Sequence, residues 1–283
     1  MNLTSRERWD KAVRAAVAVA IRLGMPAVAP VVLKDSTHTS IHLSPSSVVA
    51  RVVPSTDAPD VVQRLRRELD VARYLEQAGA PIVGPSKEVP PGPYFDDDAA
   101  LTLWQFVSHR PACESDVASA VAALRLSHEA LVNYPGELPP FNAAVDACYA
   151  LLKDEAALAP LAPTDRTFLL SEHGRLRARL AGTAAPSVVL HGDPHLGNVL
   201  MTADGPRWTD WESVCTGPLE WDLSCLPETA LPASCGVDRD VLATLRDLRS
   251  LCVSVWCWAH FEDRKSTRLN SSHSRASRMP SSA

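Results

Sequence analysis

Hydrophobic positions in the first third of the chain repeat with two different periods. Residues 6–23 are apolar at helical spacing, and the helix-ending residues Gly24 and Pro26 follow them. The stretch HTSIHLSPSSVVARVV, which starts at His38, alternates apolar and polar residues on both sides of a Pro-Ser-Ser turn. Such alternation around a turn is typical of a β-hairpin. The pattern therefore predicts an N-terminal helix followed by two short strands.

A second helix is predicted in TDAPDVVQRLRRELDVARYLEQAGAP, where Asp57 can cap the start and Gly79 with Pro81 ends the helix. Its apolar stripe at helical spacing consists of Val61, Leu65, Ala72 and Leu75. Glu68 falls on the same stripe, and a carboxylate that faces inward needs a partner. The nearest basic residue on a predicted core strand is Arg51, so we expect Arg51 and Glu68 to pair.

The remaining pattern changes from strands to helices. The stretch PGPYFDDDAALTLWQFVS predicts two strands around an acidic turn at residues 96–98, which we interpret as the solvated tip of a hairpin. From Ser115 onward helical spacing dominates, and TDRTFLLSEHGRLRARL is a further amphipathic segment. His128 falls on an apolar helix face and is predicted to be a core histidine with a hydrogen-bond partner. A small mixed lobe is thus expected before a larger helical lobe.

The composition fits a soluble globular protein of one large domain or two lobes. The chain has 283 residues, of which 46% are hydrophobic and 22% charged. No apolar run is long enough to span a bilayer, and the apolar N-terminal stretch lacks a signal-peptide cleavage pattern. Seven cysteines without a CxxC pair indicate reduced thiols in a cytoplasmic protein. The net charge of −5 argues against a general nucleic-acid binder, so we expect neither a nucleic acid nor a membrane as partner.

The last stretch, RKSTRLNSSHSRASRMPSSA at residues 264–283, has no apolar periodicity and contains five basic residues and no acidic one. Such a composition predicts a disordered basic tail. The string resembles sequencing-adapter read-through, and we therefore exclude it from fold reasoning as non-native. In that case the natural C-terminal end of the helical lobe would be missing. A native nucleic-acid-binding arm is the alternative interpretation.

The stretch VVLHGDPHLGNVLM places polar residues between two strand-like runs. An Asp-Gly pair follows in TADGPRWTDWE and predicts a hairpin turn, which would bring Asp210 back toward Asn198. Asp193, Asn198 and Asp210 would then surround one small volume. Two carboxylates and an amide are hard oxygen donors that suit Mg²⁺ and do not suit zinc. In addition, Asp193 precedes Asn198 by five residues, as in the catalytic loop H-R-D-x-x-x-x-N of protein kinases.

The combined pattern LHGDPHLGNVLM, TDWE and GPLEWDL resembles the aminoglycoside phosphotransferase and choline kinase family, and the resemblance covers most of residues 1–260. It implies an α+β, two-lobed, protein-kinase-like fold. A small N-terminal antiparallel-sheet lobe with one helix, residues 1–107, would bind nucleotide. A larger, mainly helical C-terminal lobe, residues 108–263, would carry catalysis and acceptor binding.

The resemblance also implies roles for individual residues. Asp193 would be the catalytic base, while Asn198 and Asp210 would bind Mg²⁺. Asp222, in WDLSCL, resembles the aspartate that braces the catalytic region of the family, and we expect a structural role for it.

Two departures from the family pattern concern the phosphate site. Arg51 stands where the family usually has a lysine against the α- and β-phosphates, and Glu68 would orient Arg51. The arginine side chain, with its planar guanidinium group, is longer and bulkier than that of lysine. The stretch KDSTHTSIHL has no GxGxxG, so the hydroxyls of Ser36, Thr37 and Thr39 with nearby backbone N–H groups would cover the phosphates instead. The alternative for Arg51 and Glu68 is an ion pair with a purely structural role in the core. The alternative for the KDSTHTSIHL stretch is a turn that binds no nucleotide.

The resulting hypothesis is an ATP- or GTP-dependent phosphotransferase that moves the γ-phosphate to a hydroxyl of a small molecule. The partners would be the nucleotide and this acceptor, with Mg²⁺ as cofactor. One alternative is a catalytically weak kinase-fold protein that binds a nucleotide or a metabolite. The arginine at position 51, in place of the usual lysine, is the reason to consider this alternative. The other is a metal-dependent phosphohydrolase that uses Asp193 and Asp210, although no second aspartate cluster supplies the further metal ligands.

Overall fold

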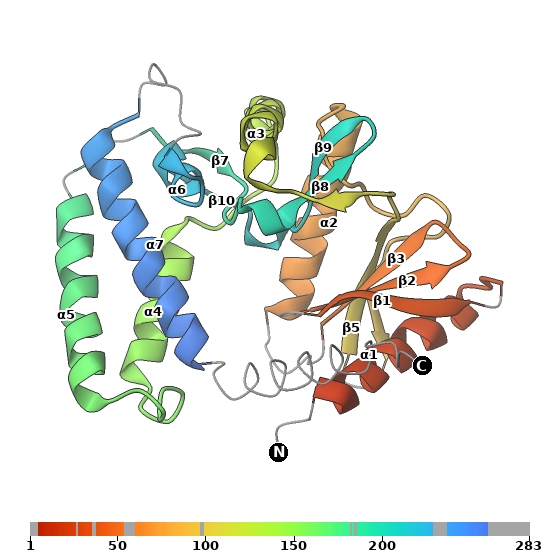
Figure 1. Ribbon diagram of the computed structural model, residues 1–283, viewed down its shortest axis with the longest axis horizontal. Helices are drawn as coiled ribbons and strands as arrows, with labels where there is room; N and C mark the ends of the chain where they lie inside the picture. Colours follow the sequence, from red (N-terminus) through yellow and green to blue (C-terminus); the bar gives the residue numbers. More distant parts are fainter. Residues whose placement is uncertain are drawn as a thin grey trace, which may run out of the picture.

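The chain has an α+β, two-lobed, protein-kinase-like fold in which a small antiparallel sheet lies at one end and a mainly helical region at the other (Figure 1). The computed structural model describes residues 5–26, 28–35, 38–53, 60–96, 99–181, 183, 186–228 and 237–259. The helices are α1 (Ser5–Arg22), α2 (Val61–Gln77), α3 (Val117–Leu131), α4 (Asn142–Lys153), α5 (Pro163–Leu180), α6 (Leu219–Leu223) and α7 (Arg239–Ala259).

The small lobe is built on a five-stranded sheet with the order β1-β2-β3-β5-β4, in which all neighbouring strands are antiparallel. Its strands are β1 (Ala29–Asp35), β2 (Thr39–Ser44), β3 (Val48–Val53), β4 (Tyr94–Asp96) and β5 (Ala99–Gln105). The two predicted hairpins are confirmed as β2–β3 and β4–β5. The strand β1 is an addition that the hydrophobic pattern does not predict.

The two faces of this sheet are covered by different helices. Alternate residues of β3, Val48, Ala50 and Val52, pack against α1 on one face. On the other face Val53 packs against Val61 and Leu65 of α2. The small lobe therefore contains α1 in addition to the helix expected from the family resemblance. Because side chains alternate along a strand, Arg51 lies on the α2 face, which is the face turned toward the rest of the protein.

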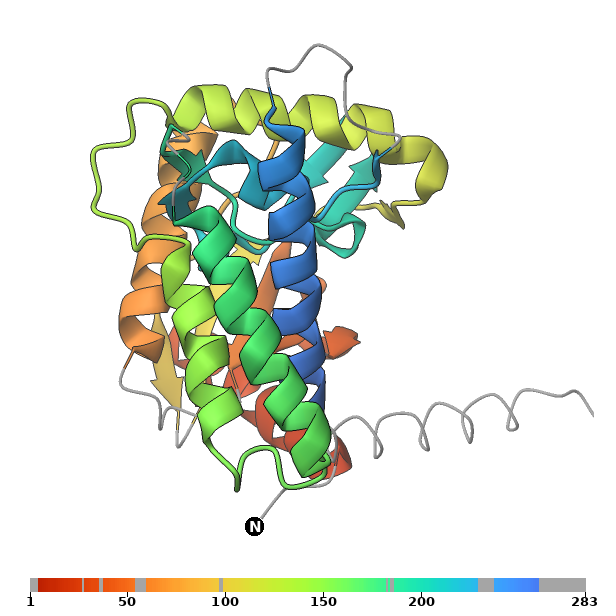
Figure 2. The same ribbon diagram turned by 90° about the vertical axis from the view of Figure 1, so that its left-hand side faces the viewer.

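The helical region packs α4, α5 and α7 side by side, with α3 running across one end (Figure 2). Short strands lie between this bundle and the small lobe, in the pairs β7 (Val188–Leu190) with β10 (Cys215–Gly217) and β8 (Val199–Thr202) with β9 (Gly205–Trp208). The strand β6 (Arg110–Pro111) adds to β8. The predicted helices before and within this region are confirmed as α1, α2, α3 and α5.

The predicted β8–β9 hairpin is confirmed, but its second strand is shorter than the sequence RWTDWE suggested. The strand ends at Trp208, and Asp210 has a φ of 68°, which is in the left-handed region and incompatible with a continuing strand. Trp208 anchors this end, since its backbone N–H donates to the carbonyl of Pro81 at 3.0 Å and its indole N–H to the carbonyl of Ala120 at 3.0 Å. The hairpin is thus attached to both lobes.

Some predicted features can be followed only in part. Asp57 and residues 97, 98 and 264–283 lie outside the described residues. At the β4–β5 turn, Asp96 forms an ion pair with Arg22 at 2.9 Å, so the first residue of the acidic run packs against α1. Among the described helices, none combines the length and the apolar character that a membrane span requires.

Candidate active site

One buried carboxylate holds the backbone of the loop that follows β7. Asp222 is fully buried and accepts hydrogen bonds from the backbone N–H groups of His191 at 2.7 Å and Gly192 at 2.8 Å. His128, the expected core histidine, donates to the same carboxylate at 2.8 Å. Burial would raise the pKa of Asp222, but the His128 contact and these backbone hydrogen bonds keep it below its usual value. An ionised Asp222 therefore fixes the backbone just before Asp193.

Gly192 is required by this geometry. Its φ is +89°, and a Cβ at this position would lie 1.9 Å from the carbonyl oxygen of Ser213. His191 joins the loop to the neighbouring hairpin, because its Nε2–H donates to the carbonyl of Thr209 at 3.0 Å. Burial lowers the pKa of His191, which keeps the ring neutral.

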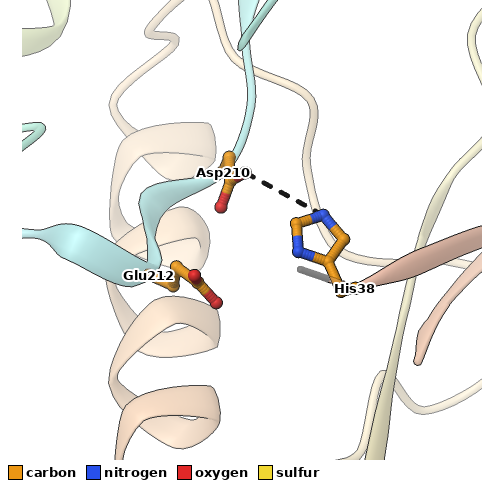
Figure 3. Close-up of side chains that lie close together, drawn as sticks. All are labelled: His38, Asp210 and Glu212. Atoms are coloured by element: carbon orange, nitrogen blue, oxygen red, sulfur yellow. Dashed lines mark ion pairs between the residues drawn. The ribbon is translucent and has the colours of Figure 1, made fainter. Parts of the chain in front are cut away.

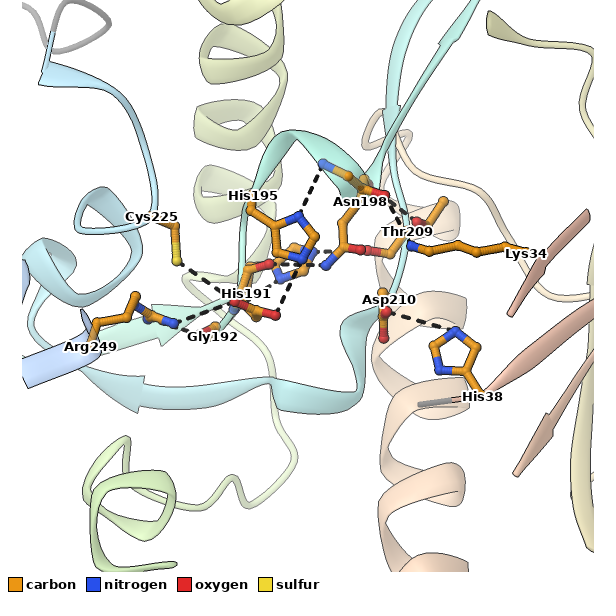
Figure 4. Close-up of polar contacts among 12 residues, drawn as sticks. Lys34, His38, His191, Gly192, His195, Asn198, Thr209, Asp210, Cys225 and Arg249 are labelled. Atoms are coloured by element: carbon orange, nitrogen blue, oxygen red, sulfur yellow. Dashed lines mark hydrogen bonds and ion pairs between the residues drawn. The ribbon is translucent and has the colours of Figure 1, made fainter. Parts of the chain in front are cut away.

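Asp193 and Asn198 lie on one short turn, as their spacing predicts. The Nδ2 of Asn198 donates to the backbone carbonyl of Asp193 at 3.1 Å, so the amide oxygen points away from that carbonyl. The backbone carbonyl of Asn198 accepts from the N–H of Thr209 at 2.9 Å, which brings the next residue, Asp210, to the same region (Figure 4). The side chain of Asp193 is 46% exposed and lies 3.4 Å from Arg249.

Arg51 and Glu68 form the expected inward ion pair. The same guanidinium also contacts Asp210 at 2.8 Å, the Nδ1 of His38 at 3.3 Å and Glu212 at 3.8 Å. One cation therefore touches three carboxylates and an imidazole, and it connects β3 and α2 to the segment after β9. The contacts to His38 and Glu212 are not predicted by the sequence pattern.

The charges in this cluster do not balance. Burial and the neighbouring carboxylates raise the pKa of Glu68 and of Glu212. Burial acts on Asp210 in the same direction, but Arg51 and nearby cations outweigh it and lower the pKa of Asp210 to about 2. Burial and Arg51 lower the pKa of His38 to about 3, so the imidazole is neutral at physiological pH. Arg51 thus faces more negative charge than it can neutralise.

The donor set of this cluster fits a divalent cation. Ligand atoms of His38, Asp210 and Glu212 all lie within 4.8 Å of one another (Figure 3). Carboxylate oxygens in a site with excess negative charge suit Mg²⁺. The amide of Asn198, whose Nδ2 is held by the Asp193 carbonyl, lies on the adjoining turn. The residues present are therefore compatible with a metal ion at Asp210.

A cavity of about 380 Å³ adjoins these groups and lies between the sheet and the β8–β9 hairpin. Its polar lining consists of Lys34, His38, Ser40, Arg51, Gln105, His109, Thr209 and Asp210. Its apolar lining includes Leu33, Val49, Val83, Trp104, Phe106, Val107, Leu196, Val199 and Leu200. The combination of an apolar wall with cationic side chains and carboxylates can hold a flat aromatic group and an anionic group together.

The sequence model described as the phosphotransferase enzyme family matches residues 36–251. The chain belongs to this family. No curated protein matches it in sequence.

Solved structures show the same fold at low identity. Choline kinase LicA from Streptococcus pneumoniae aligns with a TM-score of 0.66 and 13% identity, covering 90% of this chain and 96% of LicA. The structure of APH(2")-IIia in its GDP and kanamycin complex aligns with a TM-score of 0.65 and 16% identity, covering 93% and 99%. Aminoglycoside phosphotransferase APH(3'')-Id from Streptomyces rimosus aligns with a TM-score of 0.58 and 18% identity, covering 84% and 97%.

Among the three hydroxyl residues expected to cover the phosphates in this member of the phosphotransferase family, Thr39 alone lies within the described residues. Ser36 and Thr37 lie outside the described residues. Thr39 is buried, its hydroxyl donates to Asp35 at 2.9 Å, and it does not line the cavity. Ser40 lines the cavity instead. The reason is that β2 already begins at residue 39, so neighbouring side chains point to opposite faces of the sheet.

Proposed function

We propose that this phosphotransferase-family chain is a small-molecule kinase, which transfers the γ-phosphate of ATP or GTP to a hydroxyl group. The main support for this proposal is the position of the cavity. Arg51 and Asp210 line it, and the turn with Asp193 and Asn198 lies next to it. Nucleotide binding is also supported by two related folds, since LicA was solved in complex with AMP and APH(2")-IIia with GDP and kanamycin.

In this proposal the apolar wall of the cavity holds the base, and Lys34 with Arg51 contacts the phosphates. Both cations line the cavity, and Glu68 restrains the guanidinium of Arg51 from the α2 side. Residues 1–107 would then form the nucleotide-binding lobe, and residues 108–263 would contribute the catalytic turn and the acceptor site.

Asn198 and Asp210 are the proposed Mg²⁺ ligands, and Glu212 is a further carboxylate within reach of Asp210. When bound there, Mg²⁺ would neutralise charge that develops on the phosphate oxygens. Arg51 would have to leave Asp210, which it contacts at 2.8 Å, while keeping its bond to Glu68. The guanidinium would then be available to the nucleotide.

Asp193 is the proposed proton acceptor for the hydroxyl. Its backbone is fixed through Gly192 and Asp222, whereas its carboxylate is 46% exposed and can meet an acceptor that enters from solvent. A rigid backbone with an accessible carboxylate is the arrangement that orientation of an attacking hydroxyl requires.

The test is a turnover assay with a library of hydroxyl compounds, run beside calorimetric titration with Mg·ATP. We expect Asp193→Asn to lower kcat by about 10²–10⁴-fold, because it removes the proton acceptor, and to leave ATP affinity unchanged. Asp204→Asn is the matched control, since Asp204 lies 82% exposed at the hairpin turn. Wild-type turnover in Asp193→Asn would remove this residue from the mechanism.

The Arg51–Asp210 contact favours a second candidate, a kinase-fold protein that binds nucleotide with little turnover. In the structure the guanidinium already contacts the carboxylate that Mg²⁺ would use, at 2.8 Å. Wild-type protein that binds ATP equally well with and without Mg²⁺, and that phosphorylates no compound of the library, would support this candidate over the kinase.

A further inference from the structure

Arg249 is a buried arginine whose contacts gather on the loop that carries Asp193. It belongs to α7 and is only 7% exposed. Its guanidinium carbon lies 3.8 Å from the centre of the Trp221 ring, so the plane of the group is supported by an aromatic face. Figure 4 shows Arg249 reaching from α7 toward the loop at Gly192. The family resemblance assigned no role to this residue.

The contacts of Arg249 define one orientation of the guanidinium. Its Nη2 donates to the carbonyl oxygens of Gly192 and Trp221, both at 3.0 Å. Its Nε donates to the hydroxyl of Ser224 at 2.7 Å. The remaining arm, Nη1, approaches Oδ1 of Asp193 at 3.4 Å. The same group therefore holds the backbone just before Asp193 and one oxygen of its carboxylate.

The two carboxylate oxygens of Asp193 consequently have different surroundings. Oδ1 faces Arg249 and also the thiol of Cys225 at 3.8 Å. Oδ2 lies 3.6 Å from Nε2 of His195, which is longer than a hydrogen bond. With the side chain 46% exposed, Oδ2 is the oxygen better placed to receive a proton from an incoming hydroxyl.

We propose that Arg249 is a positioning residue for Asp193, which holds Oδ1 so that Oδ2 is presented to the acceptor hydroxyl. This inference rests on the proposed function, in which Asp193 accepts the proton. The hydroxyl oxygen bonds to the γ-phosphorus, and its proton passes to Oδ2. The bond from the γ-phosphorus to the bridging oxygen breaks, and the nucleoside diphosphate leaves with that electron pair. Arg249 gains and loses no proton.

The contact of Arg249 with Asp193 should affect kcat more than it affects the stability of the folded protein. Asp193 is 46% exposed, so solvent screens its pair with Arg249 and the pair adds little to folding stability. Misplacing a catalytic group by about 1 Å can cost about 10²-fold in rate. A carboxylate that rotates freely about its side-chain bonds would lose this placement. We therefore expect the effect on kcat to exceed the effect on nucleotide affinity.

An arginine is needed because the contacts point in several directions. A planar guanidinium can donate to two carbonyls, a hydroxyl and a carboxylate while it stacks on Trp221. A lysine keeps the charge but has a single nitrogen, so it can hold either the loop backbone or Asp193 well. Arg249→Lys should accordingly fall between wild type and Arg249→Ala.

The first experiment compares Arg249→Ala and Arg249→Lys with wild type in the full chain. ADP release is measured with ATP and the best hydroxyl acceptor from the library screen, and ATP affinity is measured by calorimetry. We expect kcat of Arg249→Ala to fall by about 10²-fold while ATP affinity stays unchanged. Arg246→Ala is the matched control, because Arg246 lies one turn earlier on α7, contacts Glu228 at 3.5 Å and is expected to keep wild-type kinetics.

The second experiment places Arg249→Ala in the Asp193→Asn background. If Arg249 acts through Asp193, the double variant should be no slower than Asp193→Asn alone, since coupled residues are not additive. Added guanidinium ion should raise kcat of Arg249→Ala and leave Asp193→Asn unchanged. Equal fold losses in both backgrounds, or a loss confined to KM and ATP affinity, would overturn the proposal and make Arg249 a structural residue.

Two further outcomes keep the test unambiguous. Arg249→Ala removes the guanidinium donor from the buried carbonyl of Gly192, whereas the carbonyl of Trp221 still accepts from the Ser224 hydroxyl at 2.6 Å. If this variant does not fold, Arg249→Lys is taken through the same cycle with the same criteria. Wild-type turnover in Asp193→Asn would mean that the proposed function fails. Impaired turnover in Asp193→Asn with wild-type turnover in both Arg249 variants would mean that only the role of Arg249 fails.

Discussion

The Arg51–Glu68 pair permits a stability prediction with an internal order. Glu68 is fully buried, and Glu68→Gln keeps an oxygen that can accept from Arg51 while it removes the charge. Removing one partner of a buried pair typically costs ~3–5 kcal/mol, because the other charge is left without a partner. Here Arg51 keeps Asp210 at 2.8 Å and Glu212 at 3.8 Å, so its charge is not left alone. We therefore expect Glu68→Gln to cost about 1.5–3 kcal/mol, the value of a charged hydrogen bond.

Substitution of the partner, Arg51, should reduce the free energy of unfolding more than Glu68→Gln does. Arg51→Met removes the cation that contacts three carboxylates at once, Glu68, Asp210 and Glu212. We expect this variant to lose about 3–5 kcal/mol in the free energy of unfolding, since the carboxylates then repel one another in a buried site. Both variants should also bind ATP more weakly, because the guanidinium is misplaced in one and absent in the other.

The assay is equilibrium unfolding in urea at pH 7, with ATP affinity measured by calorimetry on the same preparations. Asp70→Asn is the matched control on α2, because the Asp70–Arg73 pair at 2.9 Å is on the exposed side of that helix and should change stability by less than about 0.5 kcal/mol. A Glu68→Gln protein as stable as Asp70→Asn would refute the importance of the pair. A Glu68→Gln protein less stable than Arg51→Met would refute the argument from shared carboxylates.

Two further predictions concern the metal and the pH dependence of stability. Asp210→Asn removes an anionic ligand and should weaken Mg·ATP binding and turnover, measured by titration with and without Mg²⁺; equal affinities for wild type and variant would contradict the assignment. Burial lowers the pKa of His173 below its usual value of 6.5, so the folded state binds fewer protons than the unfolded state and stability is lost as pH falls below about 6.5. His173→Gln should reduce this slope by up to about 1.4 kcal/mol per pH unit in urea unfolding between pH 7 and pH 5, and an unchanged slope would show that His173 does not titrate in this way.

The sequence alone predicts the features that depend on residues close together in the chain. The hairpins and helices follow from hydrophobic periodicity and turn residues, and the position of Glu68 on an apolar stripe already required a cationic partner. The spacing of Asp193 and Asn198 could be recognised because both lie on one turn, where five residues determine the geometry. The return of Asp210 to that turn followed from the Asp-Gly hairpin, although the strand ends earlier than its pattern suggested.

Contacts between distant segments were decided only by the tertiary structure. Arg51 meets Asp210 across 159 positions of the chain, and Arg249 meets Asp193 across 56. The sequence indicated the pairing of Arg51 with Glu68, but its contact with Asp210 depends on the packing of α2 and β3 near the segment after β9. Arg249 is brought to Asp193 by the packing of α7 against α6. Ser40 rather than Thr39 lines the cavity for a related reason, because the start of β2 determines which side chain faces it. Local periodicity specifies which residues share a face, and only the packing of faces specifies which charges meet.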